Sequence, residues 1–289
     1  MVRALAKRTP DGPAPPPAVQ RLRIRYAKRG RLRFTSHRDI QRAFERALRR
    51  AEVPMAYSAG FSPHPKISWA GAAPTGTASE AEYVEISVTE TVDPQRLRDA
   101  LDEALPTGLD ILEVAEAAAG ALADRLEASV WRIELPGIEA ERARQAAAAF
   151  LAAGSVEVER LTKSGMRTFD TRSAVLSLGV EDALSGGPSP GGLPSDSSAC
   201  AILQVVVRHA TPAVRPDDVL TGLGTVGGLQ PPVPPRVTRL AQGPLAPAAP
   251  ATEPAGGTGA WPVSDPMAPD RSAPTHSGPP SIASRETGV

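Results

Sequence analysis

Cysteine is almost missing from this 289-residue sequence, whose single thiol, Cys200, stands in an apolar run. One thiol forms neither a disulfide framework nor a cysteine-based metal or iron–sulfur site within a chain. Long apolar runs are missing as well, because no segment approaches the roughly 18 apolar residues that a membrane helix needs. The charged, proline-rich N-terminus lacks the apolar core of a signal peptide. These absences predict a cytoplasmic protein that makes no contact with a membrane.

The sequence also lacks the common motifs of cofactor-dependent catalysis. It contains no phosphate-binding P-loop, no dinucleotide-binding glycine fingerprint, no nucleophile elbow and no zinc-protease motif. These absences favour a protein that is not an enzyme and that carries no cofactor or metal ion of its own.

Proline and glycine, by contrast, are abundant, with 31 and 25 residues, and they gather in three segments. The segments have no apolar periodicity, so they bury too little surface to offset the entropy lost on ordering. We expect disorder at residues 1–20 and 242–289, and a Gly/Pro/Ser insert near residues 182–199. Two folded lobes are then expected, at residues 21–117 and 128–241.

The first lobe opens with a period-two pattern, in which Leu22, Ile24 and Tyr26 alternate with arginines. This alternation predicts a strand with one buried and one basic face, and it resumes at Leu32 and Phe34. Ser36 is placed to cap a helix, with Asp39 in the acidic position of a capping box. An apolar stripe at helical spacing follows, made by Ile40, Phe44, Ala47, Leu48 and Ala51.

Further along, strands are expected at residues 66–70, 83–88 and 109–114, and a helix from Asp93-Pro94 to about Leu105. The order is strand, helix, strand, strand, helix, strand, which is the split βαβ or ferredoxin-like arrangement. The second half repeats this order more loosely, with strands at 130–135, 156–161, 172–178 and 201–208, helices at 139–153 and from Pro216, and a last edge strand at 236–240. The predicted fold is α+β, with two ferredoxin-like lobes in tandem.

Charge is strongly segregated although the net charge is zero. Residues 21–50 hold twelve basic and two acidic side chains, an excess of ten positive charges, while the acids lie mainly between Glu80 and Glu159. A basic sheet and helix that also carry aromatic residues favour RNA, whose phosphates take the charge and whose bases stack on rings. The alternative is a solvated surface whose arginines are neutralised by the acidic part of the same chain.

Three segments offer candidate ligands for an anion. Residues 35–39 place a hydroxyl, an imidazole and a guanidinium at a helix N-terminus, unless they form a capping box alone. Residues 57–66 present a histidine between two prolines, beside a lysine and two aromatic rings, unless the prolines and glycine serve only the shape of a hairpin loop. Residues 163–172 form a charged turn that is more often simply solvated. The predicted anion or nucleic-acid ligands are Arg21, Arg23, Arg25, Arg33, Ser36, His37, Arg38, Tyr57, Phe61, His64, Lys66, Lys163 and Arg172.

Three blocks of sequence resemble a known family: Phe34–Asp39, Phe44–Ala51 and Ala56–Ser68. In their order and spacing they resemble the radical S-adenosylmethionine (radical SAM)-linked domain of unknown function, in its stand-alone form. Members of that group are fused to a radical SAM enzyme or encoded beside one, so the resemblance implies such an enzyme as partner. Radical chemistry in this chain is excluded, because the iron–sulfur cluster needs three cysteines.

Three functions are compatible with these observations. We favour a noncatalytic adaptor that presents an RNA, such as tRNA or rRNA, to the partner enzyme. The second is a metal-independent ribonuclease, since paired ferredoxin-like lobes with a catalytic histidine also resemble the RNA-cleaving proteins of CRISPR systems. In it His64 or His37 would be the general base and Lys66 or Arg38 would stabilise the phosphorane. The third is a protein-only scaffold that docks the radical enzyme.

Overall fold

The computed structural model describes residues 15–162, 165–181, 199–246 and 262–268. Eight strands form one large sheet, and two more form a separate hairpin. In the sheet are β1 (Gln20–Lys28), β2 (Ile67–Ala70), β3 (Ala78–Val88), β4 (Ile111–Glu116), β5 (Ala128–Pro136), β8 (Val175–Glu181), β9 (Cys200–Arg208) and β10 (Arg236–Gly243). The hairpin pairs β6 (Glu157–Thr162) with β7 (Gly165–Asp170).

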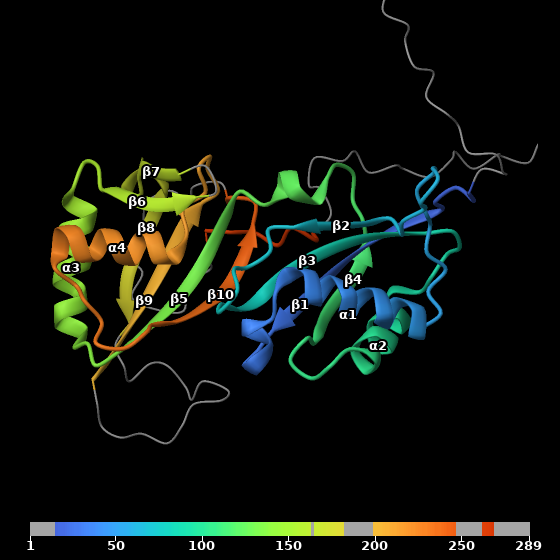
Figure 1. Ribbon diagram of the computed structural model, residues 1–289, viewed down its shortest axis with the longest axis horizontal. Helices are drawn as coiled ribbons and strands as arrows, with labels where there is room; N and C mark the ends of the chain where they lie inside the picture. The colour runs from blue at the N-terminus through green and yellow to red at the C-terminus, as the bar shows by residue number, and fades with distance from the viewer. Residues whose placement is uncertain (1–14, 163–164, 182–198, 247–261, 269–289) are drawn as a thin grey trace, which may run out of the picture.

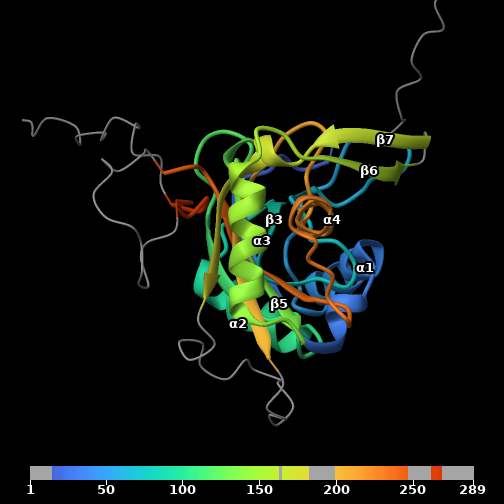
Figure 2. The same ribbon diagram turned by 90° about the vertical axis from the view of Figure 1, so that its left-hand side faces the viewer.

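Four α-helices are present in the described residues: α1 (His37–Arg50), α2 (Pro94–Ala104), α3 (Ala140–Ala152) and α4 (Pro216–Gly227). The described residues also hold three short 3-10 turns: η1 (Gly30–Phe34), η2 (Leu122–Arg125) and η3 (Arg172–Ala174). Figure 1 shows α1 and α2 beside β1 to β4 in one half of the molecule, and α3 and α4 beside β5, β8 and β9 in the other. The β6–β7 hairpin lies outside the large sheet, beside α4 (Figure 2).

The sheet joins the two halves through one parallel contact. Strands follow the order β4-β1-β3-β10-β5-β9-β8, and β2 pairs with the end of β3 that β10 leaves free. All pairs are antiparallel except β10 with β3, where Thr238 and Arg239 meet Ala78 and Ser79. The fold is therefore α+β with a mostly antiparallel sheet, and β10, expected at an edge, is instead the strand that links the halves.

Two apolar cores lie under the helices, one in each half. In the first, Leu22 and Ile24 of β1 pack with Phe44 of α1 and Leu101 of α2. In the second, Ile133 of β5 and its neighbours pack with α3, α4, β8 and β9. Alternate residues of each strand face the core, which is the period-two pattern expected of a half-buried strand.

Helix starts agree with the sequence pattern, which confirms both predicted caps. The Ser36 hydroxyl accepts from the Asp39 backbone N–H at 3.2 Å, and the Asp93 carboxylate accepts from the Arg96 N–H at 2.8 Å. The alternation at Leu32 and Phe34 was misread as strand. Gly30 has a φ of +54°, which turns the chain into η1 rather than letting β1 continue.

The C-terminal boundary also differs from expectation. The last strand extends to Gly243, and Leu245 bridges to Val263. Val263 and Met267 are buried against the sheet, so part of the segment assigned to a disordered tail is packed. The N-terminal boundary differs too, because the Val19 N–H donates to the Val88 carbonyl at 2.8 Å and Gln20 already belongs to β1. Residues 1–14, 182–198, 247–261 and 269–289, also expected to be disordered or part of the insert, lie outside the described residues. Among the described helices, none combines the length and apolar character that crossing a bilayer requires.

Candidate nucleic-acid interface

The arginines of β1 are occupied by groups of the same chain. Glu85, opposite Arg23 on β3, accepts from the Arg23 Nε at 3.0 Å and from Arg21 at 3.3 Å. Arg23 is fully buried, and its Nη2 also donates to the Ala118 and Gly120 carbonyls. Arg25 donates to the Glu80 carbonyl at 3.0 Å. The arginines of this strand thus bond to groups of the same chain, Arg21 and Arg23 to one shared glutamate, and Arg23 in particular is closed to any external phosphate.

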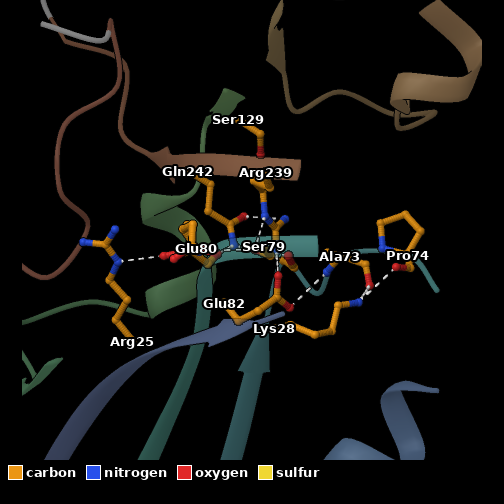
Figure 3. A network of polar contacts seen from close by, with 12 residues as sticks. Arg25, Lys28, Ala73, Pro74, Ser79, Glu80, Glu82, Ser129, Arg239 and Gln242 are labelled. Carbon is orange, nitrogen blue, oxygen red and sulfur yellow. Dashed lines mark hydrogen bonds and ion pairs between the residues drawn. The ribbon is translucent and has the colours of Figure 1, made fainter. Parts of the chain in front are cut away.

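Lys28, Glu82 and Arg239 form a buried polar network where the halves meet (Figure 3). Glu82 pairs with Arg239, which comes from β10 in the other half, and its second oxygen accepts from the Ala73 N–H at 3.1 Å. Burial opposes ionisation of Glu82, yet the Arg239 guanidinium and these hydrogen bonds hold its pKa below the ordinary value. Burial lowers the pKa of Lys28. Lys28 donates to the carbonyls of Ala73 and Pro74, at 3.3 and 3.0 Å.

This network holds the β2–β3 loop, residues 71–77, against the sheet. Besides the bonds at Ala73 and Pro74, the Gln242 amide donates to the Gly71 carbonyl at 3.2 Å. At its far end the loop holds η1, because the Gly76 N–H donates to the Arg33 carbonyl at 2.7 Å and the Arg33 Nε donates to the Gly76 carbonyl at 2.9 Å. Arg33, expected to bind an anion, therefore uses one edge of its guanidinium inside the chain.

The outer face of α1 is different, because its arginines are exposed. Arg38, Arg42, Arg46 and Arg49, called here the arginine stripe, follow one another at four, four and three residues, so they share one side of the helix. The opposite side carries the buried residues Ile40, Phe44, Ala47 and Leu48. Among the described residues, the stripe has one acidic partner, Asp39, which lies 3.6 Å from Arg42. The stripe is about 16 Å long at the helical rise per residue.

The N-terminus of α1 is engaged mostly in its own cap. The Ser36 hydroxyl accepts from the Asp39 N–H and donates to the Asp39 carboxylate at 2.7 Å, so the capping-box alternative describes Ser36. The His37 ring lies edge-on to Trp69 with 5.2 Å between centroids, and its Nε2 is 3.1 Å from the Gln41 amide. Burial lowers the pKa of His37.

Phe34, just before α1, is a surface residue that sequence reasoning missed. The alternation from β1 assigned it to the buried face of a strand, but its ring is 65% exposed. The Arg33 guanidinium lies over that ring, 5.2 Å from the centroid. A glycine at position 30 was the available signal that the strand had ended.

Residues 56–66 form an ordered hairpin loop. The Ser58 N–H donates to the His64 carbonyl at 2.9 Å, the His64 N–H donates to the Ser58 hydroxyl at 3.0 Å, and Tyr57 bridges to Pro65. Tyr57, Phe61, His64 and Lys66 are exposed around it. His37 contacts the Trp69 ring of β2, whereas His64 lies in the hairpin loop that precedes this strand.

The candidates of the second half do not join this surface. Arg172 donates to the carbonyls of Leu151 and Val175, at 3.3 and 3.0 Å, and so ties α3 to β8. Lys163 lies outside the described residues. In the described part of the chain, no three His, Cys, Asp or Glu side chains gather as metal ligands would.

Residues 21–216 match the family described as "Uncharacterized protein conserved in bacteria (DUF2344)". The chain belongs to this family. The match confirms the resemblance to a domain of unknown function. A search of curated proteins finds no match.

Among solved structures, the chain is similar to one titled "Crystal Structure of an Unknown Protein from Galdieria sulphuraria". The two are 16% identical, the match covers 76% of this chain and 98% of that one, and the TM-score is 0.22.

Together, the candidates of the first half divide into an internal and an external set. The internal set comprises Arg21, Arg23, Arg25 and Ser36, each of which makes at least one side-chain hydrogen bond within the chain. The external set comprises the arginine stripe, Phe34 and the hairpin loop 56–66. The basic surface therefore lies on α1 and not on the sheet.

Proposed function

We propose that this chain is a noncatalytic RNA-binding protein that serves a radical SAM enzyme as an accessory, presenting tRNA or rRNA to it. The observation that carries the proposal is the arginine stripe of α1, whose four exposed guanidiniums have one acidic ion-pair partner, Asp39, among the described residues. Guanidiniums without internal partners release counterions when they neutralise phosphates, which is the main source of affinity for nucleic acid.

The strand order of the sheet supports a further proposal, which concerns the fold. The first half has the order β4-β1-β3-β2 and the second has β10-β5-β9-β8. With β5, β8, β9 and β10 taken as the four main strands of the second half, both halves follow the order fourth, first, third, second. We propose that each half is a ferredoxin-like lobe and that the β6–β7 hairpin is an addition to the second. Fold alone carries no function, so the RNA proposal rests on α1.

The partner part of the proposal rests on the resemblance of the blocks at residues 34–39, 44–51 and 56–68 to the radical SAM-linked domain. A chain with the single cysteine Cys200 supplies too few thiolates for the iron–sulfur cluster, so the partner has to supply it. Affinity purification of the tagged chain from its own host, with mass spectrometry, tests this part. Recovery of an enzyme with a three-cysteine cluster motif is expected, and reproducible absence of one would remove the partner from the proposal.

Neutralising part of the stripe tests RNA binding directly. The double variant Arg46→Gln/Arg49→Gln is expected to bind labelled tRNA more weakly at every salt concentration. The slope of log affinity against log salt is expected to fall by about 0.7 to 0.9 for each phosphate that the variant no longer neutralises. Fluorescence anisotropy between about 50 and 300 mM salt, in EDTA, measures both quantities.

The matched control is Arg96→Gln/Arg144→Gln, which removes the same charge from exposed positions on α2 and α3. Equal weakening by both double variants would mean that net charge, not the stripe, determines binding, and would overturn the proposal. New RNA ends that appear in EDTA and disappear in His64→Ala would replace the adaptor with the ribonuclease. Absence of RNA binding at about 100 mM salt would favour the protein-only scaffold.

A further inference from the structure

The geometry around Phe34 points to single-stranded rather than duplex RNA as the ligand, with Phe34 as the platform on which one unpaired base stacks. This inference rests on the proposed function and deepens it by naming the form of RNA that the α1 surface takes.

Phe34 combines exposure with a cation on its ring. Its side chain is 65% exposed, whereas Phe44, ten residues later, is fully buried. Single exposed apolar residues are common on protein surfaces, so exposure alone carries little. The Arg33 guanidinium, however, covers the ring at 5.2 Å from its centroid, and aromatic rings flanked by arginine are the recurrent platform for unpaired bases.

The ring is presented by a rigid backbone. Within η1, the Leu32 N–H donates to the Arg29 carbonyl at 3.1 Å, and the Thr35 N–H donates to the Leu32 carbonyl at 3.0 Å. Arg33 makes two hydrogen bonds with Gly76, one through its backbone carbonyl and one through its side chain. A platform fixed before binding loses little entropy when a base stacks on it.

The support extends into the buried network. Gly76 belongs to the loop 71–77, which Lys28, Glu82 and Gln242 hold through its backbone. The chain of contacts therefore runs from the ion pair of Glu82 with Arg239, through the loop, to Arg33 and the Phe34 ring. These residues position the platform without touching the proposed base.

The nearness of Phe34 to the stripe along the chain bears on the form of RNA. Phe34 precedes Arg38, the first member of the stripe, by four residues. A strand whose base stacks on Phe34 can place its following phosphates along α1. In an A-form duplex the bases are stacked on each other and their faces are closed to a side chain, so a duplex can use the arginines but not the ring.

Phe61 supplies a matched control. It is 71% exposed at the hairpin loop 56–66, and within the described residues no cation lies over its ring. Phe34→Leu and Phe61→Leu thus remove similarly exposed rings and retain an apolar side chain at each position.

The test compares a single-stranded RNA of about 12 nucleotides with a duplex of the same length, each bound to the full chain and to the variants. Phe34→Leu is expected to weaken single-strand binding about tenfold and to leave duplex binding unchanged. Phe61→Leu is expected to leave both unchanged, and Phe34→Trp to retain single-strand binding, because tryptophan also offers a stacking face. Urea unfolding of each variant checks that the fold is intact.

The outcomes separate this inference from the proposed function. If Phe34→Leu binds single strands as the parent does, or if the parent prefers the duplex, the stacking platform is wrong while the effect of Arg46→Gln/Arg49→Gln still supports RNA binding. If the parent binds neither RNA, the proposed function fails and this inference fails with it.

Discussion

The arginines of the basic segment differ in whether their charge is available to an external anion, and burial determines which of them are available. Arg23 is fully buried and Arg239 is 3% exposed, and each is paired with a glutamate of the same chain. A buried guanidinium without such a partner would carry the full cost of desolvation. The arginines of α1 extend into solvent and need no internal anion. Counting charges along residues 21–50 therefore overstates the cationic surface, because the arginines of β1 bond to groups of the same chain, with Arg21 and Arg23 sharing Glu85.

His209 illustrates how one buried contact assigns a proton. Its Nδ1 lies 2.7 Å from the Leu126 carbonyl, which only accepts, so Nδ1 carries the hydrogen. Its Nε2 is then free to accept from the Ser129 hydroxyl, 2.7 Å away. Burial lowers the pKa of His209 from its ordinary value of 6.5, and the nearby Arg239 charge acts in the same direction.

Because the pKa of His209 is lower in the folded chain than in the unfolded chain, the unfolded chain binds more protons near pH 6. The stability that neutral His209 contributes is therefore fully present above about pH 6.5 and is lost as pH falls through the folded pKa. We expect the free energy of unfolding to fall between about pH 7.5 and pH 5. Urea titrations across this range measure it. His209→Gln should flatten the curve, and an unchanged slope would assign the effect elsewhere. The pKa of His37 is lowered in the same direction, so His37→Gln is the companion variant.

At the scale of elements, local signals were enough to predict those structures that depend on neighbours in sequence. The cap at Ser36, the start at Asp93-Pro94 and the apolar stripe of α1 all follow from residues within one or two helical turns. The place of β10 does not, because its parallel contact with β3 joins residues 160 positions apart. Of the β6–β7 hairpin, β6 was predicted as a strand at residues 156–161, but β7 was read as part of a charged turn, since it has a single buried residue, Phe169.

The candidate site was predicted in part for the same reason. The exposed arginines of α1 follow from helical periodicity alone. The sequence has no signal that Glu85 lies opposite Arg23, because that pairing depends on the register between β1 and β3. Nor does it show that loop 71–77 returns to hold Arg33, because the loop is anchored by Lys28, Glu82 and Gln242 from three different strands.

The loop 71–77 depends on a glycine where it leaves β2. Gly71 has a φ of +56°, and a Cβ there would collide with the Gln242 side chain and lie 2.9 Å from the Leu126 Cδ1. We expect Gly71→Ala to lower the free energy of unfolding by about 2 kcal/mol or more, because left-handed backbone strain and the collision add. Gly179→Ala, in β8, has open space at its Cβ and is the control. Urea unfolding measures both, and equal stability of the two variants would contradict the packing described.

At the scale of the whole molecule, the two halves share charges as well as a sheet. Arg239 belongs to β10, yet its partner Glu82 and its neighbour Ser79 belong to β3 in the first half. On its other side the Arg239 guanidinium lies over the Trp131 ring of β5, 5.3 Å from the centroid. Separating the halves would remove the guanidinium that balances the Glu82 carboxylate. We infer that the halves unfold together rather than as independent domains.

Two tryptophans make this inference measurable, because Trp69 lies in the first half and Trp131 in the second. With Trp261 replaced by phenylalanine, Trp131→Phe leaves Trp69 as the reporter, and Trp69→Phe leaves Trp131. The two urea transitions are expected to have the same dependence of unfolding free energy on urea concentration. Their midpoints are expected to differ only by the effect of each substitution on the stability of the whole chain, and circular dichroism of the same samples measures that effect. Adding Arg239→Met should lower the free energy of unfolding seen by Trp69 by about 3 kcal/mol, although the change is in the other half, because it leaves the Glu82 carboxylate buried without its guanidinium partner. A Trp69 transition that ignores Arg239→Met, or that departs from the transition seen by circular dichroism, would show that the halves unfold independently.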